Sequence, residues 1–142
     1  MALTEWDKSL SVNIKLMDIQ HENLLNITID ITQSIQQNQQ EKALTQFENL
    51  LNYLQFHFAE EEKLLEKEKY NDFYHHKSQH LILISDIHRR FEIIENGNDE
   101  LFLLYIEIIH ELLVSHSQIE FKNKNFKEVI IVGGGAGGAR RI

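Results

Sequence analysis

Three pairs of residues of metal-binding type stand four positions apart along the chain. The pairs are His57 with Glu61, His76 with His80, and His116 with Glu120. Because an α-helix turns about 100° per residue, side chains four positions apart share a face. Imidazole and carboxylate groups suit zinc, iron, manganese or copper, and they do not choose among these metals. The spacing therefore indicates a metal centre carried by helices.

A further histidine, His21, stands beside Leu24 and Leu25 in another segment. A lone histidine near apolar residues is more often a hydrogen-bonded core residue than a ligand. The full set of candidate ligands favours a metal centre instead, because five histidines and two carboxylates would be costly to bury unless they were paired. A metal centre removes that cost. The set is too large for one tetrahedral ion, but it is enough for two ions bridged by carboxylates.

The remaining three histidines are expected to lie outside this centre. His75, His88 and His110 stand roughly 80° to 120° around a helix from the nearest candidate ligand. They are therefore predicted to be surface or core residues.

Four segments with apolar residues at three- and four-residue spacing must position these ligands. Short joins between long helices force neighbouring helices to be antiparallel. The sequence therefore predicts an all-α fold, an up-down-up-down four-helix bundle. Residues 1–17 lack a clear period and are expected to form an N-terminal arm packed on the bundle. The predicted helices span residues 18–38, 41–67, 71–95 and 99–122.

Composition narrows the class of protein. The chain has 142 residues, a net charge of −8, no cysteine and no proline. The absence of cysteine excludes thiolate zinc sites, iron–sulfur clusters and disulfides. The net negative charge argues against nucleic acid as a partner. No apolar run approaches the roughly 18 residues of a membrane span, and the N-terminus lacks a signal-peptide pattern, so a cytoplasmic location is expected.

The ligand pattern resembles the hemerythrins, and in particular the bacterial hemerythrin domains. The resemblance covers about residues 5–126, and residues 1–126 are expected to form one domain. Five histidines and a carboxylate fall at the spacing and in the order of that family. The matching elements are Trp6, "QH" at 20–21, "HFAEE" at 57–61, Tyr70 with His76 and His80, and "LLVSH" at 112–116.

The resemblance implies a non-haem centre of two iron ions, joined by an oxo or hydroxo bridge, that binds dioxygen reversibly. It assigns His76, His80 and His116 to one iron. His21 and His57 hold the other iron, which keeps an open position for dioxygen. Glu61 bridges the two ions.

One position departs from the family pattern. The family usually places an aspartate five residues after its last histidine, where this chain has Phe121. The nearest acid is Glu120, four residues after His116. A position four residues on faces the site better than one five residues on, and glutamate reaches one methylene farther than aspartate. Glu120 is therefore expected to be the second bridge.

The resemblance also implies an apolar oxygen pocket that keeps water from the irons. Leu24 and Leu113 match pocket-lining positions of the family. Phe56 and Phe58 flank His57, and either could shield the site.

The last residues, 127–142, differ from the rest of the chain. Val129–Val132 is a β-type apolar run, and glycines at 133, 135 and 138 follow it. This pattern resembles the opening of a dinucleotide-binding fold of FAD- or NAD-dependent oxidoreductases. It lacks the helix and the acidic residue that such a site needs. The expectation is a truncated start of a flavoprotein domain, and the alternative is an incidental extension.

Three functions remain open from the sequence. The first is an oxygen carrier, store or sensor, or a supplier of dioxygen to a fused or partner flavoprotein oxidoreductase. The second is a diiron enzyme that acts on oxygen, peroxide or nitric oxide. Ferritin-like diiron enzymes use two Glu-x-x-His motifs, and this chain has only Glu107–His110, on the wrong face. The third is a metal-free interaction bundle, which the number of potential ligands disfavours.

Overall fold

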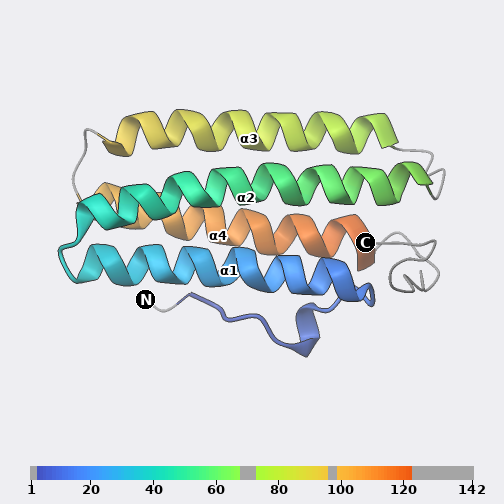
Figure 1. Cartoon of the computed structure of the whole chain (residues 1–142), viewed down its shortest axis with the longest axis horizontal. Coiled ribbons are helices and arrows are strands. Elements are labelled where there is room, and N and C mark those ends of the chain that lie inside the picture. Colours follow the sequence, from blue (N-terminus) through green and yellow to red (C-terminus); the bar gives the residue numbers. More distant parts are fainter. Residues whose placement is uncertain (1–2, 68–72, 96–98, 123–142) are drawn as a thin grey trace.

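The computed structural model describes residues 3–67, 73–95 and 99–122, without the side chains of Phe73 and residues 117–122. A short 3-10 turn, η1 (Lys8–Leu10), precedes four helices that lie side by side (Figure 1). The predicted all-α four-helix bundle is confirmed. The predicted helix starts differ from the observed ones by at most three residues. The helices are α1 (Lys15–Gln36), α2 (Gln40–Lys67), α3 (Phe73–Glu95) and α4 (Asp99–Lys122).

Consecutive helices run in opposite directions, as Figure 1 shows. α1 packs against α2 and α4, and α3 packs against the same two helices. The four helices therefore form a ring in chain order, and each contributes one face to a common interior. Within the part of the chain that the structure describes, no helix is long and apolar enough to cross a membrane.

A left-handed residue reverses the chain between α1 and α2. Asn38 has φ 61°, a conformation that asparagine tolerates better than most residues. The backbone N–H of Gln39 donates to the carbonyl of Ser34 at 2.8 Å, and that of Asn38 donates to the carbonyl of Ile35 at 3.0 Å. This pair of bonds is a Schellman motif, which satisfies the last carbonyls of α1. It turns the chain so that α2 returns alongside α1.

The N-terminal arm is fastened to the first turn of α1 by Asp18. Its carboxylate accepts hydrogen bonds from the hydroxyl of Ser11 at 2.6 Å and from the backbone N–H of Val12 at 2.9 Å. Farther out along the arm, Trp6 and Leu10 pack against the apolar core. The predicted arm is confirmed, and it covers the side of the bundle near His21.

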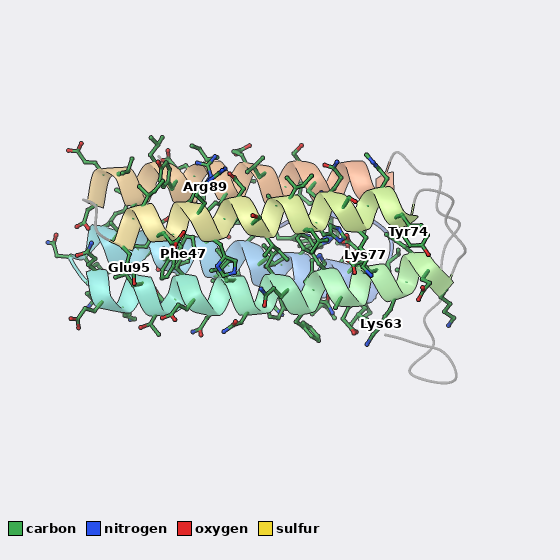
Figure 2. All side chains as sticks on the ribbon, turned by 90° about the horizontal axis from the view of Figure 1, so that it is seen from above. Phe47, Lys63, Tyr74, Lys77, Arg89 and Glu95 are labelled. Carbon is green, nitrogen blue, oxygen red and sulfur yellow. The ribbon has the colours of Figure 1, made fainter. Side chains whose placement is uncertain are left out.

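The interior has an apolar end and a polar end. Phe47 stacks on Phe91 with ring centroids 5.0 Å apart, and it meets Phe102 edge-on at 6.0 Å. Phe47 lies toward the end of the bundle where α2 begins, whereas Lys63 and Lys77 lie toward the opposite end (Figure 2). His76 and His80 flank Lys77 on α3 and therefore belong to this second end. The apolar end supplies packing, and the polar end holds the candidate site.

Residues 127–142 lie outside the described part of the chain. The prediction that they begin a dinucleotide-binding domain, and the proposed domain boundary at residue 126, therefore stay predictions.

Candidate metal centre

Glu61 stands at the centre of the polar end with its side chain fully buried. Its Oε2 atom lies 3.2 Å from Nε2 of His57 and 3.8 Å from Nε2 of His21. Its Oε1 atom lies 2.8 Å from Nε2 of His80 and 3.7 Å from Nε2 of His116. One carboxylate from α2 therefore faces histidines from all four helices, with a different pair at each oxygen.

These residues form two groups that share Glu61. His21, His57 and Glu61 make one group, and Glu61, His80 and His116 make the other. Within each group the ligand atoms lie within 4.8 Å of one another. Imidazole nitrogen and carboxylate oxygen are suitable ligands for first-row transition metals. Each group could hold a metal ion, and the two groups have the Glu61 carboxylate in common.

The protonation states suit metal binding. Burial alone would raise the pKa of the Glu61 carboxyl, but the four surrounding imidazoles hold it well below its usual range. Burial lowers the pKa of His57, and the neighbouring Glu61 carboxylate offsets only part of that effect. At neutral pH the carboxyl is therefore ionised and the His57 imidazole is neutral. These are the forms that bind metal ions.

Two polar side chains fix the orientation of the imidazoles. The Nδ1 atom of His57 lies 2.7 Å from Oε1 of Gln20, and Nδ1 of His80 lies 2.8 Å from Oε2 of Glu62. Both partner atoms are acceptors, so each Nδ1 carries the proton that it donates. The Nε2 lone pairs are then directed toward Glu61. This is the usual orienting role of hydrogen bonds behind metal-binding histidines.

The contacts around Glu61 fit a cation better than a network of hydrogen bonds. Nε2 of His80 lies only 3.0 Å from Nε2 of His116. Since the proton of His80 is on Nδ1, the His116 ring donates its Nε2 proton to His80 in this contact, and a bound metal ion would take the place of that proton. Among the described residues, neither oxygen of Glu61 accepts a hydrogen bond of regular geometry, although both are buried. Buried polar atoms without such bonds are costly, and a bound metal ion satisfies them.

Phe58 covers one side of the histidine cluster. It is buried, and its ring stacks on His80 with centroids 3.9 Å apart and planes within 2°. Its ring also lies 5.4 Å from that of His116. Phe56, the other candidate shield, is 50% exposed and packs against Tyr53 instead. One residue before His57 points about 100° away from it, so Phe58 is the better placed of the two candidate shields, and the role of either in an oxygen pocket stays a prediction.

A small cavity lies beside His21. Leu24 and Leu113 line it together with Leu25 and Val114, and its use as an oxygen pocket stays a prediction. Trp6 and Leu10 of the N-terminal arm also line it. It has room for about one water-sized molecule. An apolar cavity therefore lies next to His21, the candidate ligand on α1.

Two predicted ligands are placed less fully. His76 is buried on α3 one turn before His80, but it joins neither of the two groups in the described part of the chain. Glu120 belongs to the last turns of α4, and its side chain lies outside the described residues. Their roles as ligands stay predictions.

The three histidines predicted to lie elsewhere are separate from both groups. His75 and His88 are exposed on α3. His110 is completely buried, and its Nδ1 lies 2.8 Å from the hydroxyl oxygen of Thr28 on α1. This contact joins α4 to α1 outside the histidine cluster.

Three residues near the site were not predicted to have a role there. Gln20 and Glu62 orient the imidazoles, and Trp6 lines the cavity. Trp6 and Gln20 belong to the pattern that resembles the hemerythrins, whereas the only signal for Glu62 was its position next to Glu61. Gln20 and Glu62 each lie about 100° around the helix from the neighbouring candidate ligand and so reach a histidine on the next helix.

Comparisons with known proteins agree with this geometry. No family model matches the chain. The chain is 32% identical over 105 residues to a bacteriohemerythrin of Pseudomonas paraeruginosa, covering 71% of this chain and 68% of that protein. It is 25% identical over 120 residues to the bacteriohemerythrin of Methylococcus capsulatus, covering 82% of this chain and 89% of that protein. Together with a four-helix bundle that places histidines from every helix around one carboxylate, this similarity shows that the chain belongs to the hemerythrin family.

Proposed function

We propose that this protein binds two iron ions and uses them to bind dioxygen reversibly. The observation that carries the proposal is the division of the Glu61 carboxylate between two pairs of histidines. A carboxylate shared in this way suits two adjacent cations. The names of the relatives support iron over the other metals that these ligand types accept.

The ligands divide unequally between the two ions. His21 and His57 hold one ion, and His76, His80 and His116 hold the other. Glu61 bridges both, and Glu120 is the second bridge. The ion with fewer histidines keeps an open position, and it is the one beside the cavity that His21 lines. Two iron ions held by these residues, with an oxo or hydroxo bridge, would supply the electrons for reversible binding of dioxygen.

The protein side chains control access and proton position. Leu24, Leu25 and Leu113 give the cavity apolar walls, which favour an apolar diatomic molecule over water. Phe58 shields the opposite side of the cluster by its stack on His80. Gln20 holds the proton of His57 on Nδ1 and so keeps Nε2 available to a metal ion. These features suit reversible binding, in which no other molecule reaches the centre.

An optical experiment tests the proposal. Protein reconstituted with two equivalents of ferrous iron is exposed to air and then returned to vacuum. Reversible binding predicts a visible absorption band that appears in air and disappears under vacuum, over repeated cycles. A band that never forms, or a spectrum that remains oxidised after one exposure, contradicts reversible binding. Catalytic consumption of peroxide or nitric oxide by the same sample would instead support the enzyme alternative.

The partner prediction follows from the tail and is separate from the centre. We propose that the protein supplies dioxygen to a flavoprotein oxidoreductase, fused or separate. The glycine pattern at residues 133–138 supports this proposal. Dioxygen consumption by a flavin-dependent oxidase with NADH at limiting dioxygen, compared between the oxygenated full chain and a variant that ends at residue 126, tests whether the tail contributes.

A further inference from the structure

The indole N–H of Trp6 is an enclosed hydrogen-bond donor. The Nε1 atom is buried, although the side chain as a whole is only partly buried against the apolar core. Within the part of the chain that the structure describes, no protein atom accepts a hydrogen bond from Nε1. Such donors are rare in folded proteins, because a buried N–H without an acceptor is destabilising. The Trp6 donor therefore needs a partner from outside the protein.

The ring that carries this donor lines the cavity beside His21. The cavity has room for about one water-sized molecule. Among the described residues that line it, only Trp6 and His21 have a polar side-chain atom. The other lining residues are aliphatic, namely Leu10, Leu24, Leu25, Leu113 and Val114. A small molecule in this cavity is therefore placed next to the indole.

Free water fits this cavity poorly. A buried water usually makes about three hydrogen bonds, and the side chains that line the cavity offer it two polar groups at most. One of these, His21, belongs to a candidate metal group, with its Nε2 atom 3.8 Å from Oε2 of Glu61. A molecule that is already bound to a metal ion beside His21 needs only one further partner. The cavity therefore suits a metal-bound ligand that has an acceptor atom pointing away from the metal.

The N-terminal arm holds the donor in position before a ligand arrives. The carboxylate of Asp18 accepts hydrogen bonds from Ser11 and Val12, which fastens the arm to the first turn of α1. Nearer to Trp6, the carboxylate of Asp7 accepts a hydrogen bond from the backbone N–H of Ser9 at 2.7 Å and caps the η1 turn. A donor that is fixed in this way loses little conformational freedom when it binds an acceptor.

We propose that the indole N–H of Trp6 donates a hydrogen bond to the small molecule bound at the open metal position, and thereby favours ligands that carry negative charge. This inference rests on the proposed function, because the cavity adjoins the ion that is predicted to have the open position. Hydrogen bonds to charged acceptors are stronger than those to neutral ones. A neutral diatomic molecule gains little from the indole on entry, and it gains more once electrons have moved onto it. The leucines favour entry of an apolar molecule, and Trp6 favours its charged, bound form.

Azide binding to the oxidised, iron-loaded full chain tests the donor. Azide is a small linear anion, so one end can bind the metal ion while the other reaches into the cavity. Because the chain has a single tryptophan, a tryptophan analogue with sulfur in place of the indole N–H replaces Trp6 alone. The analogue keeps the size of the ring, and it should raise the Kd for azide at least about tenfold, as expected for a lost hydrogen bond to a charged group. Trp6→Phe should raise the Kd by a similar factor or more.

Ultraviolet resonance Raman spectroscopy detects the hydrogen bond itself. The indole bands respond to hydrogen bonding at Nε1, and they arise from Trp6 alone. Azide should shift these bands in the iron-loaded protein. In metal-free protein the same azide concentration should leave them unchanged, because no metal ion holds the anion beside the indole. A purely structural role of Trp6 would give no such shift.

Leu10→Ala is the matched control, since Leu10 lines the same cavity from the same arm and carries no donor. It should raise the Kd for azide less than the analogue does. Circular dichroism and iron analysis verify that each protein is folded and loaded. An iron-loaded protein whose Kd the analogue leaves unchanged, whose indole bands do not respond to azide, or in which Leu10→Ala weakens binding as much as the analogue, overturns this proposal alone. A wild-type chain that takes up no iron overturns the proposed function and this proposal together.

Discussion

Oε1 of Glu61 lies 2.8 Å from Nε2 of His80, and the imidazole directs that nitrogen by donating its Nδ1 proton to Glu62. The second oxygen of the same carboxylate faces His57 and His21 in the other group. A single buried residue on α2 thus joins ligands of α1, α3 and α4.

Ligand and surface histidines should respond differently to substitution. His57→Ala removes a buried ligand, and the protein should lose at least one iron. Because metal binds only the folded state, the iron-loaded protein should also lose roughly 3 kcal/mol of stability, or about 10 °C in Tm. His75→Ala, at an exposed position on α3, should retain both irons and the wild-type Tm. Equal iron loss in both variants would show that the helix faces are wrongly assigned.

The hydrogen bond between His57 and Gln20 should affect iron affinity, although Gln20 itself is not a ligand. Gln20→Leu removes the acceptor that lies 2.7 Å from Nδ1 of His57. Iron affinity should fall by about 10- to 100-fold, which is typical when such a partner is lost. Gln20→Glu, which keeps an acceptor, should restore most of it. A competition titration with a chelator gives the affinities. Unchanged affinity in Gln20→Leu means that this contact does not orient a ligand.

Glu120 should respond to side-chain length as well as charge. Glu120→Gln removes one of two negative charges shared by the ions, so iron affinity should fall and spontaneous oxidation should accelerate. Glu120→Asp should also be harmful, because at four residues after His116 the shorter side chain stops about one bond short. Iron content and the lifetime of the oxygenated state are the measurements. If both variants behave as wild type, Glu120 is a solvated charge near the end of α4.

His110 should make the metal-free protein sensitive to acid. Burial lowers the pKa of His110 from its usual value, with Glu111 offsetting part of the shift. Below pH ~6.5 the unfolded chain therefore binds a proton that the folded chain does not, and stability falls as the pH drops toward the folded pKa. His110→Gln should reduce the slope of unfolding free energy between pH 6.5 and 5 by up to ~1.4 kcal/mol per pH unit. Urea unfolding in the presence of a chelator measures it, and identical slopes in the two proteins contradict the assignment.

Periodicity predicted the bundle well because the chain contains no proline and its apolar residues follow one helical face over long segments. The limits of α1 were less clear, since Asp18 fastens the arm through Ser11 and Val12, and these side-chain bonds have no periodic pattern. α1 consequently begins three residues before the predicted start.

The centre was predictable only in part. Residues four apart share a face, so His57 and Glu61 were found together. The hydrogen bonds between helices were not predicted, because spacing within one helix does not indicate them. Gln20 on α1 accepts from His57 on α2, and Glu62 on α2 accepts from His80 on α3. Phe56 illustrates a related point, because it neighbours His57 in sequence and is 50% exposed. A residue next to a ligand in sequence lies on a different face of the helix. What that face contacts depends on how the neighbouring helix packs, which the sequence does not indicate.

The central claim is that Glu61 joins two iron ions in each chain. Anaerobic titration of metal-free protein with ferrous iron, followed by elemental analysis, tests it most directly, with Glu61→Gln as the comparison. Wild-type protein should saturate at two irons per chain. Glu61→Gln should saturate at one or none, because a neutral amide lacks the negative charge that lets a carboxylate bind two cations. Saturation of wild-type protein at one iron, or two irons retained by Glu61→Gln with unchanged affinity, would contradict it.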